Sequence, residues 1–234
     1  MRLNAYLARA GVASRRKADE IIKAGKVTIN GKPAKLNSDV TDNDDVEIDG
    51  RKISSQRLRY ILLHKPAGTL TTLKDPHGRR KVADLLRIPE RVVPVGRLDY
   101  DTTGALLLTN DGELAHKLMH PSFEVDKVYE AEVEGNVTKQ MLDKLSNGVR
   151  LEDGMTSPAK VRLLPGRPKQ TIELTIHEGR RHQVKRMLSA VGLTVLSLHR
   201  SRYGFLSLQD LGAARWRDLS TEEINRLKNG TIAG

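Results

Sequence analysis

The stretch VGRLDYDTTGALLLTNDG, residues 95–112, places two acids and an arginine between Gly96 and Gly104. A run of three leucines follows Gly104. Asp99 and Asp101 are spaced as Asp-x-Asp, a pattern that holds a divalent cation in nucleotide-sugar glycosyltransferases, although two carboxylates alone indicate a metal only weakly. Alternatively, both acids are turn formers that accept hydrogen bonds from nearby backbone N–H groups. In a third interpretation Asp99 is a nucleophile or general base, which a cation such as Arg97 keeps ionised. The stretch by itself leaves all three open.

A cationic partner for Asp99 is most readily supplied by HEGRRHQVKRM, residues 177–187, a segment dense in basic and imidazole side chains. A helix is predicted over 181–191, because apolar residues recur at helical spacing from Val184 to Val191. Lys185 and His182 then lie on one side of this helix. The alternative is a basic helix end that faces RNA without taking part in catalysis.

Short strands alternate with scattered helices around these two segments. Apolar runs predict strands that start at Tyr60 and cover 106–109, 128–133, 171–176 and 195–201, and amphipathic spacing predicts helices over 112–119, 139–146, 181–191 and 221–228. The segment LLPGRPKQ, residues 163–170, is predicted to be a surface hairpin loop, because it holds two prolines and a glycine. Strands with segregated helices are typical of the α+β class.

The N-terminal residues have a pattern of their own, which predicts a compact module of two helices followed by strands. Helical spacing covers 3–10 and 15–24, with Ser14 as the N-cap of the second helix. Strands follow at 27–29 and 46–48. The pairs Asn30-Gly31 and Asp49-Gly50 are typical of tight hairpin turns, because these residues tolerate positive φ. We expect a domain at 1–53, a polar linker at 54–57 and a larger domain at 58–234.

The charge balance points to a polyanionic partner. The chain holds 40 Lys and Arg against 29 Asp and Glu, a formal net charge of +11, so nucleic acid is the expected partner. Residues 1–35 carry nine basic and two acidic side chains, whereas 36–53 carry two basic and six acidic ones, so the helices and the first hairpin should face it. A solvated basic face and a DNA-reading helix-turn-helix are the alternatives. The residues expected to contact RNA are Arg2, Arg9, Arg15, Arg16, Lys17 and Lys26.

Composition also excludes several kinds of site. The chain contains no cysteine, which excludes disulfides, thiolate metal sites and a cysteine nucleophile. No apolar run approaches the roughly 20 residues of a membrane-spanning helix, and the N-terminus lacks the apolar core of a signal peptide. We therefore expect a cytoplasmic protein that does not bind membranes.

Several motifs, taken in order, resemble those of the pseudouridine synthases, in the branch typified by enzyme A of the small ribosomal subunit and enzyme B of the large one. They are HKPAG at 64–68, GRLDYDTTGALLLTNDG at 96–112, KVY at 127–129, EGRRHQVKRM at 178–187 and RSRYG at 200–204. The stretch LARAGVASRRKADEIIKAGKVTINGK, residues 7–32, resembles the S4 RNA-binding domain. The resemblance covers nearly the whole chain. It implies a small S4-like module followed by a mixed, mainly antiparallel sheet with flanking helices.

The resemblance also implies roles for individual residues. Asp99 would be the catalytic aspartate, Tyr129 the tyrosine against the target base, and Lys185 the basic partner of the Asp99 carboxylate. Arginine is common at the position of Lys185, so this chain keeps the charge but loses the fixed bidentate fork. Ala105 replaces the usual leucine and should alter packing only. The substrate-binding residues that the motifs imply are Arg97, Arg180, His182, Gln183 and Arg200.

The implied reaction is the isomerisation of uridine to pseudouridine, which requires neither a metal nor an organic cofactor. An ionised Asp99 can attack or deprotonate the sugar, or attack the base, and Tyr129 can stack on a uridine that has left the RNA stack. The motifs resemble most closely those of the enzymes that act on the large ribosomal RNA, so we expect 23S rRNA as substrate, with 16S rRNA as the alternative. The RNA is either free or within a ribosome assembly intermediate, and the protein is expected to be a monomer. The rival hypothesis is a non-catalytic RNA-binding or ribosome-assembly protein, which would tolerate Asp99→Asn.

Overall fold

The computed structural model describes residues 1–230, which form two compact units. The first unit consists of Met1–Arg59 together with Ile88–Val93 and Thr109–Glu113. The second consists of Tyr60–Arg87, Pro94–Leu108 and the described residues from Leu114 onward. None of the helices in residues 1–230 has the length and apolar character that a membrane crossing needs.

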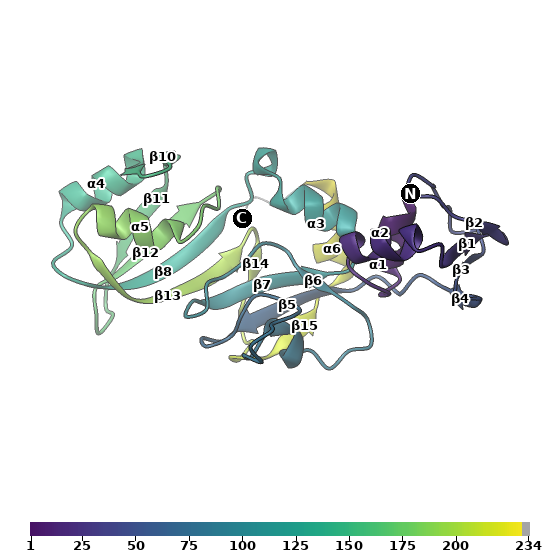
Figure 1. Ribbon diagram of the computed structural model, residues 1–234. Helices are drawn as coiled ribbons and strands as arrows, with labels where there is room; N and C mark the ends of the chain where they lie inside the picture. The colour runs from purple at the N-terminus through teal and green to yellow at the C-terminus, as the bar shows by residue number, and fades with distance from the viewer. Residues whose placement is uncertain (231–234) are drawn as a thin grey trace. The chain divides into compact units, whose positions relative to one another are not determined.

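The first unit begins with two helices, α1 (Leu3–Arg9) and α2 (Arg15–Lys23), as the spacing predicts. The Ser14 hydroxyl accepts a hydrogen bond from the Lys17 N–H at 3.3 Å, which confirms Ser14 as the N-cap. Four strands follow and form an antiparallel sheet in the order β2-β1-β3-β4 (Figure 1). They are β1 (Val27–Ile29), β2 (Lys32–Pro33), β3 (Val46–Ile48) and β4 (Arg51–Ile53).

Both hairpins of the first unit turn at residues with positive φ, as their sequences predict. The φ angles are 50° and 75° at Asn30 and Gly31, and 47° and 72° at Asp49 and Gly50. Positive φ at both central residues is the signature of a type I′ turn, whose twist matches that of the flanking strands. Buried residues of both helices pack with Val46 in one core, so the helices are held against the small sheet.

The second unit is built on one large mixed sheet in the order β11-β12-β8-β13-β7-β5-β15 (Figure 1). Most of its registered pairs are antiparallel, and β13 with β7 is parallel. This arrangement confirms the α+β class and the mixed, mainly antiparallel sheet. The strands are β5 (Tyr60–Lys65), β7 (Thr103–Thr109), β8 (Lys127–Glu134), β11 (Lys160–Leu164), β12 (Thr171–Ile176), β13 (Thr194–Tyr203) and β15 (Trp216–Asp218), with β6 (Val93–Pro94) beside β7 and β14 (Leu206–Ser207) beside β13.

The helices of the second unit lie where the sequence predicts them. They are α3 (Gly112–Met119), α4 (Lys139–Asn147), α5 (Gln183–Ala190) and α6 (Thr221–Asn229), with short 3-10 turns η1 (Val82–Leu85) and η2 (Pro121–Phe123). Helix α3 has the predicted ends, and the ends of α4, α5 and α6 shift by at most two residues. Helix α4 contacts β11, and α5 contacts β13 (Figure 1). Helix α5 starts two residues later than predicted, because His182 takes a left-handed conformation with φ of 50° and breaks the helical hydrogen-bonding pattern.

One local prediction needs correction, and one short hairpin has no counterpart among the predicted elements. Leu163 and Leu164 are not in the surface loop but extend β11, where Leu163 pairs with Ile172 of β12, so the loop is confined to 165–170. The short hairpin of β9 (Arg150–Leu151) and β10 (Gly154–Met155) was not predicted. Its two-residue strands are too short to give an alternating pattern, and pairing across the turn defines them.

The parallel pair of β13 and β7 brings motifs from different segments together. Arg200 of β13 lies opposite Gly104 of β7. A Cβ atom on Gly104 would stand 2.3 Å from the Arg200 carbonyl oxygen, so only glycine allows this approach, and its φ of 123° also favours glycine. The glycine that ends the 96–104 stretch therefore sets the position of Arg200 relative to Asp99.

Candidate active site

A cleft of about 940 Å³ in the second unit collects seven of the eight predicted catalytic and substrate-binding residues. Its walls are the loop 96–102, strands β8 and β13, and the segment 176–184 before and at the start of α5. The predicted residues on its lining are Arg97, Asp99, Tyr129, Arg180, His182, Gln183 and Arg200. Four segments of the chain therefore meet around one concave surface, which is the usual form of a small-molecule or nucleotide site.

The loop that carries Asp99 is fixed from beneath by Lys65, the last residue of β5. The Lys65 side chain is fully buried, and its Nζ donates to the carbonyls of Asp99 at 3.0 Å, Tyr100 at 3.3 Å and Thr102 at 2.8 Å. Burial lowers the pKa of this ammonium to about 8. The sequence motif at 64–68 contains Lys65 but does not indicate this role. The available signal is a lysine at the end of a strand that starts with a run of four apolar residues, Tyr60 to Leu63.

The Asp99 carboxylate lies at the wall of the cleft, with its side chain 31% exposed. Its candidate cation is His182, whose Nε2 lies 3.5 Å from Asp99 Oδ1. The left-handed backbone at His182 precedes the first turn of α5 and presents the imidazole there. The contact is an ion pair when the imidazole is protonated and a weak polar contact when it is neutral.

Lys185 does not form the predicted pair with Asp99. Its Nζ donates to both carboxylate oxygens of Asp101, at 2.7 and 2.6 Å, and this contact holds the pKa of Asp101 below its usual range. Asp101 is the more exposed acid, at 67%, and is accessible to a flexible ammonium from the first turn of α5. The two acids thus have separate partners. Within residues 1–230 no three His, Asp or Glu side chains gather as metal ligands would.

Tyr129 and Arg200 form the floor of the cleft, side by side on β8 and β13. The Arg200 side chain is 2% exposed, its Nε donates to the Ala105 carbonyl at 2.8 Å, and its Nη1 donates to the Tyr129 hydroxyl at 3.4 Å. The guanidinium carbon lies 5.9 Å from the centre of the Tyr129 ring and 5.3 Å from that of Tyr203. Both rings stabilise the buried charge through cation–π contact.

Two buried polar atoms on this lining have no hydrogen-bond partner among the described residues. They are Nη2 of Arg200 and the hydroxyl oxygen of Thr102, a residue 1% exposed. Buried polar groups are nearly always hydrogen-bonded, because leaving one unpaired costs about 1–3 kcal/mol. No pattern in the sequence singles out Thr102. These two atoms are suited to bond a ligand that enters the cleft.

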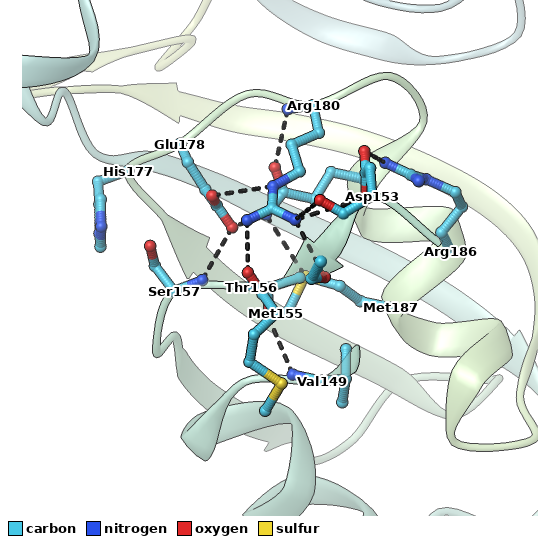
Figure 2. A network of polar contacts seen from close by, with 12 residues as sticks. Val149, Asp153, Met155, Thr156, Ser157, His177, Glu178, Arg180, Arg186 and Met187 are labelled. Carbon is cyan, nitrogen blue, oxygen red and sulfur yellow. Dashed lines mark hydrogen bonds and ion pairs between the residues drawn. The ribbon is translucent and has the colours of Figure 1, made fainter. Parts of the chain in front are cut away.

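Arg180, predicted to bind substrate, lines the cleft and is also the centre of an internal network (Figure 2). Its Nε donates to Glu178 at 3.2 Å, and its Nη1 donates to the carbonyl of Gly154 at 3.1 Å and reaches Asp153 at 3.4 Å. Its Nη2 donates to the Met155 carbonyl. Gln183 also serves this network, by donating to Glu178. These bonds hold the segment 177–182, which precedes α5 and forms the rim of the cleft, against the β9–β10 hairpin.

The residues predicted to contact RNA in the first unit are mostly paired within it. Four have carboxylate partners: Arg2 with Asp39, Arg9 with Asp42, Lys17 with Glu20 and Lys26 with Asp49. Arg15 donates to Asn4 at 3.4 Å, and Arg16 is exposed and makes no side-chain bond among the described residues. The acidic stretch 36–53 therefore neutralises part of the basic surface instead of lying apart from it. Of these six residues, Arg15 and Arg16 carry the charge that no carboxylate in residues 1–230 offsets.

Comparison with known proteins gives these sites a family. The RNA pseudouridylate synthase family matches residues 59–190, and the S4 domain matches residues 1–46. The chain is 50% identical over 97% of its length to ribosomal large subunit pseudouridine synthase B of Bacillus subtilis, covering 95% of that protein. It is 42% identical over 97% of its length to the protein of that name from Escherichia coli, covering 82% of it.

A solved structure agrees with this assignment. A crystal structure of a pseudouridylate synthase superimposes with a TM-score of 0.71 at 30% sequence identity, with 97% of this chain and 99% of that chain covered. The match includes the segments that build the cleft, since both chains are covered almost completely. On sequence, motif order and fold together, the chain belongs to the RNA pseudouridylate synthase family.

Proposed function

We propose that this protein isomerises one uridine to pseudouridine in 23S rRNA, with Asp99 as the catalytic carboxylate. The observation that carries the proposal is the state of Asp99 in the cleft. Glu178, the other acid on the lining, is held by Arg180 and Gln183. Within residues 1–230, the Asp99 carboxylate receives no hydrogen bond from a lysine or arginine, and it lies beside Tyr129 and Arg200 on the same lining.

The reaction breaks the N1–C1′ bond of uridine and forms a C5–C1′ bond, with loss of the C5 proton and gain of a proton at N1. Atoms and electrons balance without an oxidant or reductant. An ionised Asp99 can start it by attacking C1′, by removing a sugar proton or by attacking the uracil ring. In each route the carboxylate must be ionised and the detached uracil must be retained, which a cleft with a closed floor favours.

The floor residues have complementary tasks in this proposal. Tyr129 stacks on the flipped uracil, which offsets part of the few kcal/mol that unstacking costs. Arg200 Nη2 and the Thr102 hydroxyl form hydrogen bonds with the polar edge of the nucleotide, which satisfies the two unpaired atoms. His182 contacts the Asp99 carboxylate, and a protonated His182 favours the ionised form of Asp99. Arg97, on the lining of the cleft, meets the RNA backbone.

The substrate and the working form of the protein are part of the same proposal. The names of the Bacillus subtilis and Escherichia coli relatives support an RNA of the large ribosomal particle, and the S4-domain match supports RNA contact by the first unit. We propose that Arg15 and Arg16 are the main phosphate contacts of the first unit and that the domain boundary lies near 54–57. We also propose that the active form is a monomer and that it acts in the cytoplasm, where ribosomal RNA is assembled. Comparing free RNA with an assembly intermediate as substrates decides which of the two the protein uses.

The test is chemical mapping of pseudouridine in 23S and 16S rRNA incubated with the wild type, Asp99→Asn or Asp101→Asn. We expect one new site in 23S rRNA with the wild type and none with Asp99→Asn, whose affinity for the RNA stays within about twofold. Asp101→Asn is the matched control and keeps the site, because Asp101 lies outside the cleft lining. Activity of Asp99→Asn, or no new site with the wild type, would overturn the proposal.

A further inference from the structure

Tyr100 directly follows Asp99 and is the one exposed tyrosine among the five in the chain. It is 52% exposed, whereas Tyr6, Tyr60, Tyr129 and Tyr203 are at most 8% exposed. Exposed aromatic rings are scarce in this chain, since only 3% of its residues are Phe, Trp or Tyr. Tyr100 is also not among the residues that line the cleft, whereas Asp99 is.

The backbone under this ring is held rigidly. The Tyr100 carbonyl accepts hydrogen bonds from the Gly68 N–H at 2.9 Å, the Thr69 N–H at 3.4 Å and Lys65 Nζ at 3.3 Å. The hydroxyl of Tyr100 lies 3.8 Å from where a Cβ atom on Gly68 would stand, so the ring extends over the glycine of the 64–68 motif. A rigid, exposed ring loses little conformational entropy when it binds a partner.

A cationic loop begins a few residues after Gly68, the glycine that the ring covers. Lys74, Arg79 and Arg80 are exposed in the segment 74–80. Asp75 fixes Arg79 by accepting from its backbone N–H at 2.9 Å and its Nη2 at 2.7 Å. The end of the loop is held by the Leu70 N–H, which donates to the Arg80 carbonyl at 2.9 Å, and the preceding residue, Thr69, donates its N–H to the Tyr100 carbonyl at 3.4 Å. The backbones of Tyr100 and Arg80 are thus bonded to adjacent residues, which places the end of the loop near Tyr100.

We propose that Tyr100 and the loop 74–80 form a second nucleotide subsite, in which the ring stacks on a base adjoining the target uridine and the loop cations meet its phosphates. The partner is identified by its chemistry, since stacking on an aromatic ring beside cations is how single-stranded nucleic acid is bound. The subsite rests on the proposed function. It adds a platform outside the cleft, one residue along the chain from Asp99, at which the RNA strand is held while the target base enters.

The test uses a synthetic RNA fragment that spans the uridine found by mapping, made intact and with an abasic residue at either neighbouring position. On intact RNA, Tyr100→Ala should lower kcat/KM by about tenfold, the loss of one base stack, and Tyr100→Phe should stay within about twofold because stacking does not need the hydroxyl. On one of the two abasic RNAs the wild type and Tyr100→Ala should become equal. Leu196→Ala removes a side chain of similar exposure, 48%, and is the matched control that changes nothing.

Two results would overturn the subsite: full activity of Tyr100→Ala on intact RNA, or the same loss on both abasic RNAs. Thermal melting of each variant excludes misfolding as the cause. Failure of the proposed function would be distinguishable, because the wild type would then form no pseudouridine. In that case the dissociation constants of the wild type and Tyr100→Ala for the 23S rRNA transcript decide the matter, and equal affinities would reject the subsite.

Discussion

The arginine at the rim of the cleft and the arginine at its floor differ in how many of their donors are hydrogen-bonded. At the rim, Arg180 directs its donors to Glu178, Asp153 and the carbonyls of the β9–β10 hairpin. At the floor, Arg200 is more deeply buried and yet keeps Nη2 unpaired among the described residues, as Thr102 keeps its hydroxyl. A satisfied network makes a wall rigid, whereas an unpaired buried donor raises the free energy of the empty protein until a ligand bonds it. The comparison assigns support to the rim and recognition to the floor.

The largest effect is expected at the floor. Arg200→Lys should lower kcat/KM by about 10²-fold, the scale for losing one donor to a reacting group. An ammonium has no planar fork with which to bond the Ala105 carbonyl and also present a second nitrogen to the cleft. Single-turnover assays on the 23S rRNA fragment measure the loss.

A substitution at Thr102 tests whether its hydroxyl binds substrate or only fills space at the floor of the cleft. Thr102→Val keeps the shape and removes the hydroxyl, and a loss of about tenfold in kcat/KM is the scale for one hydrogen bond to substrate. Thr102→Ser is the control that restores it. If Thr102→Val is as active as the wild type and as stable, the unpaired hydroxyl is not a ligand contact and the contrast between floor and rim weakens.

A change at the rim should act on stability more than on chemistry. Arg180→Lys removes the bonds from the guanidinium to the hairpin and should lower the free energy of unfolding by about 2 kcal/mol, with a loss of activity of only a few-fold. Urea unfolding measures this. A double-mutant cycle with Asp153→Asn should give a coupling energy above about 0.5 kcal/mol, because the two side chains contact each other. An unchanged unfolding midpoint with a large loss of activity would make Arg180 a substrate contact after all.

The smallest effect is expected at the exposed pair of Lys185 and Asp101. The hydrogen bond from Lys185 depresses the pKa of Asp101. Such a carboxylate adds stability above its unfolded pKa of about 3.9, and this stability is lost as the pH falls through the folded value. Because Asp101 is 67% exposed, the contribution at pH 7 is below about 1 kcal/mol.

Lys185→Met should therefore lower the free energy of unfolding slightly at neutral pH, with the difference from the wild type vanishing in acid below the depressed pKa. Unfolding curves at several pH values, with Lys144→Met as an exposed lysine control on α4, measure it. A loss of activity as large as that of Asp99→Asn would instead show that Lys185 moves to Asp99 during the reaction.

The sequence alone determined the family, the α+β class and most of the elements. The motifs are local and ordered, and local physics fixes what they encode: the Ser14 cap, the Asn30-Gly31 turn and the apolar strand after Gly104 all follow from residue types a few positions apart. The resemblance of the motifs also predicts a catalytic role for Asp99 and Tyr129 and a substrate-binding role for Arg200, and these roles stay predictions.

Only the tertiary structure decided which charges meet. Lys185 and Asp101 are 84 positions apart, and Lys65 and Asp99 are 34 apart, so no spacing rule could choose Asp101 for Lys185 or place Lys65 beneath the Asp99 loop. Hydrogen bonds and ion pairs need positions fixed to within a fraction of an ångström, and here those positions come from the packing of α5 against β13 and from the place of β5 beside β7 in the sheet. The sequence supplied the chemical groups, and the packing of distant strands determined their partners.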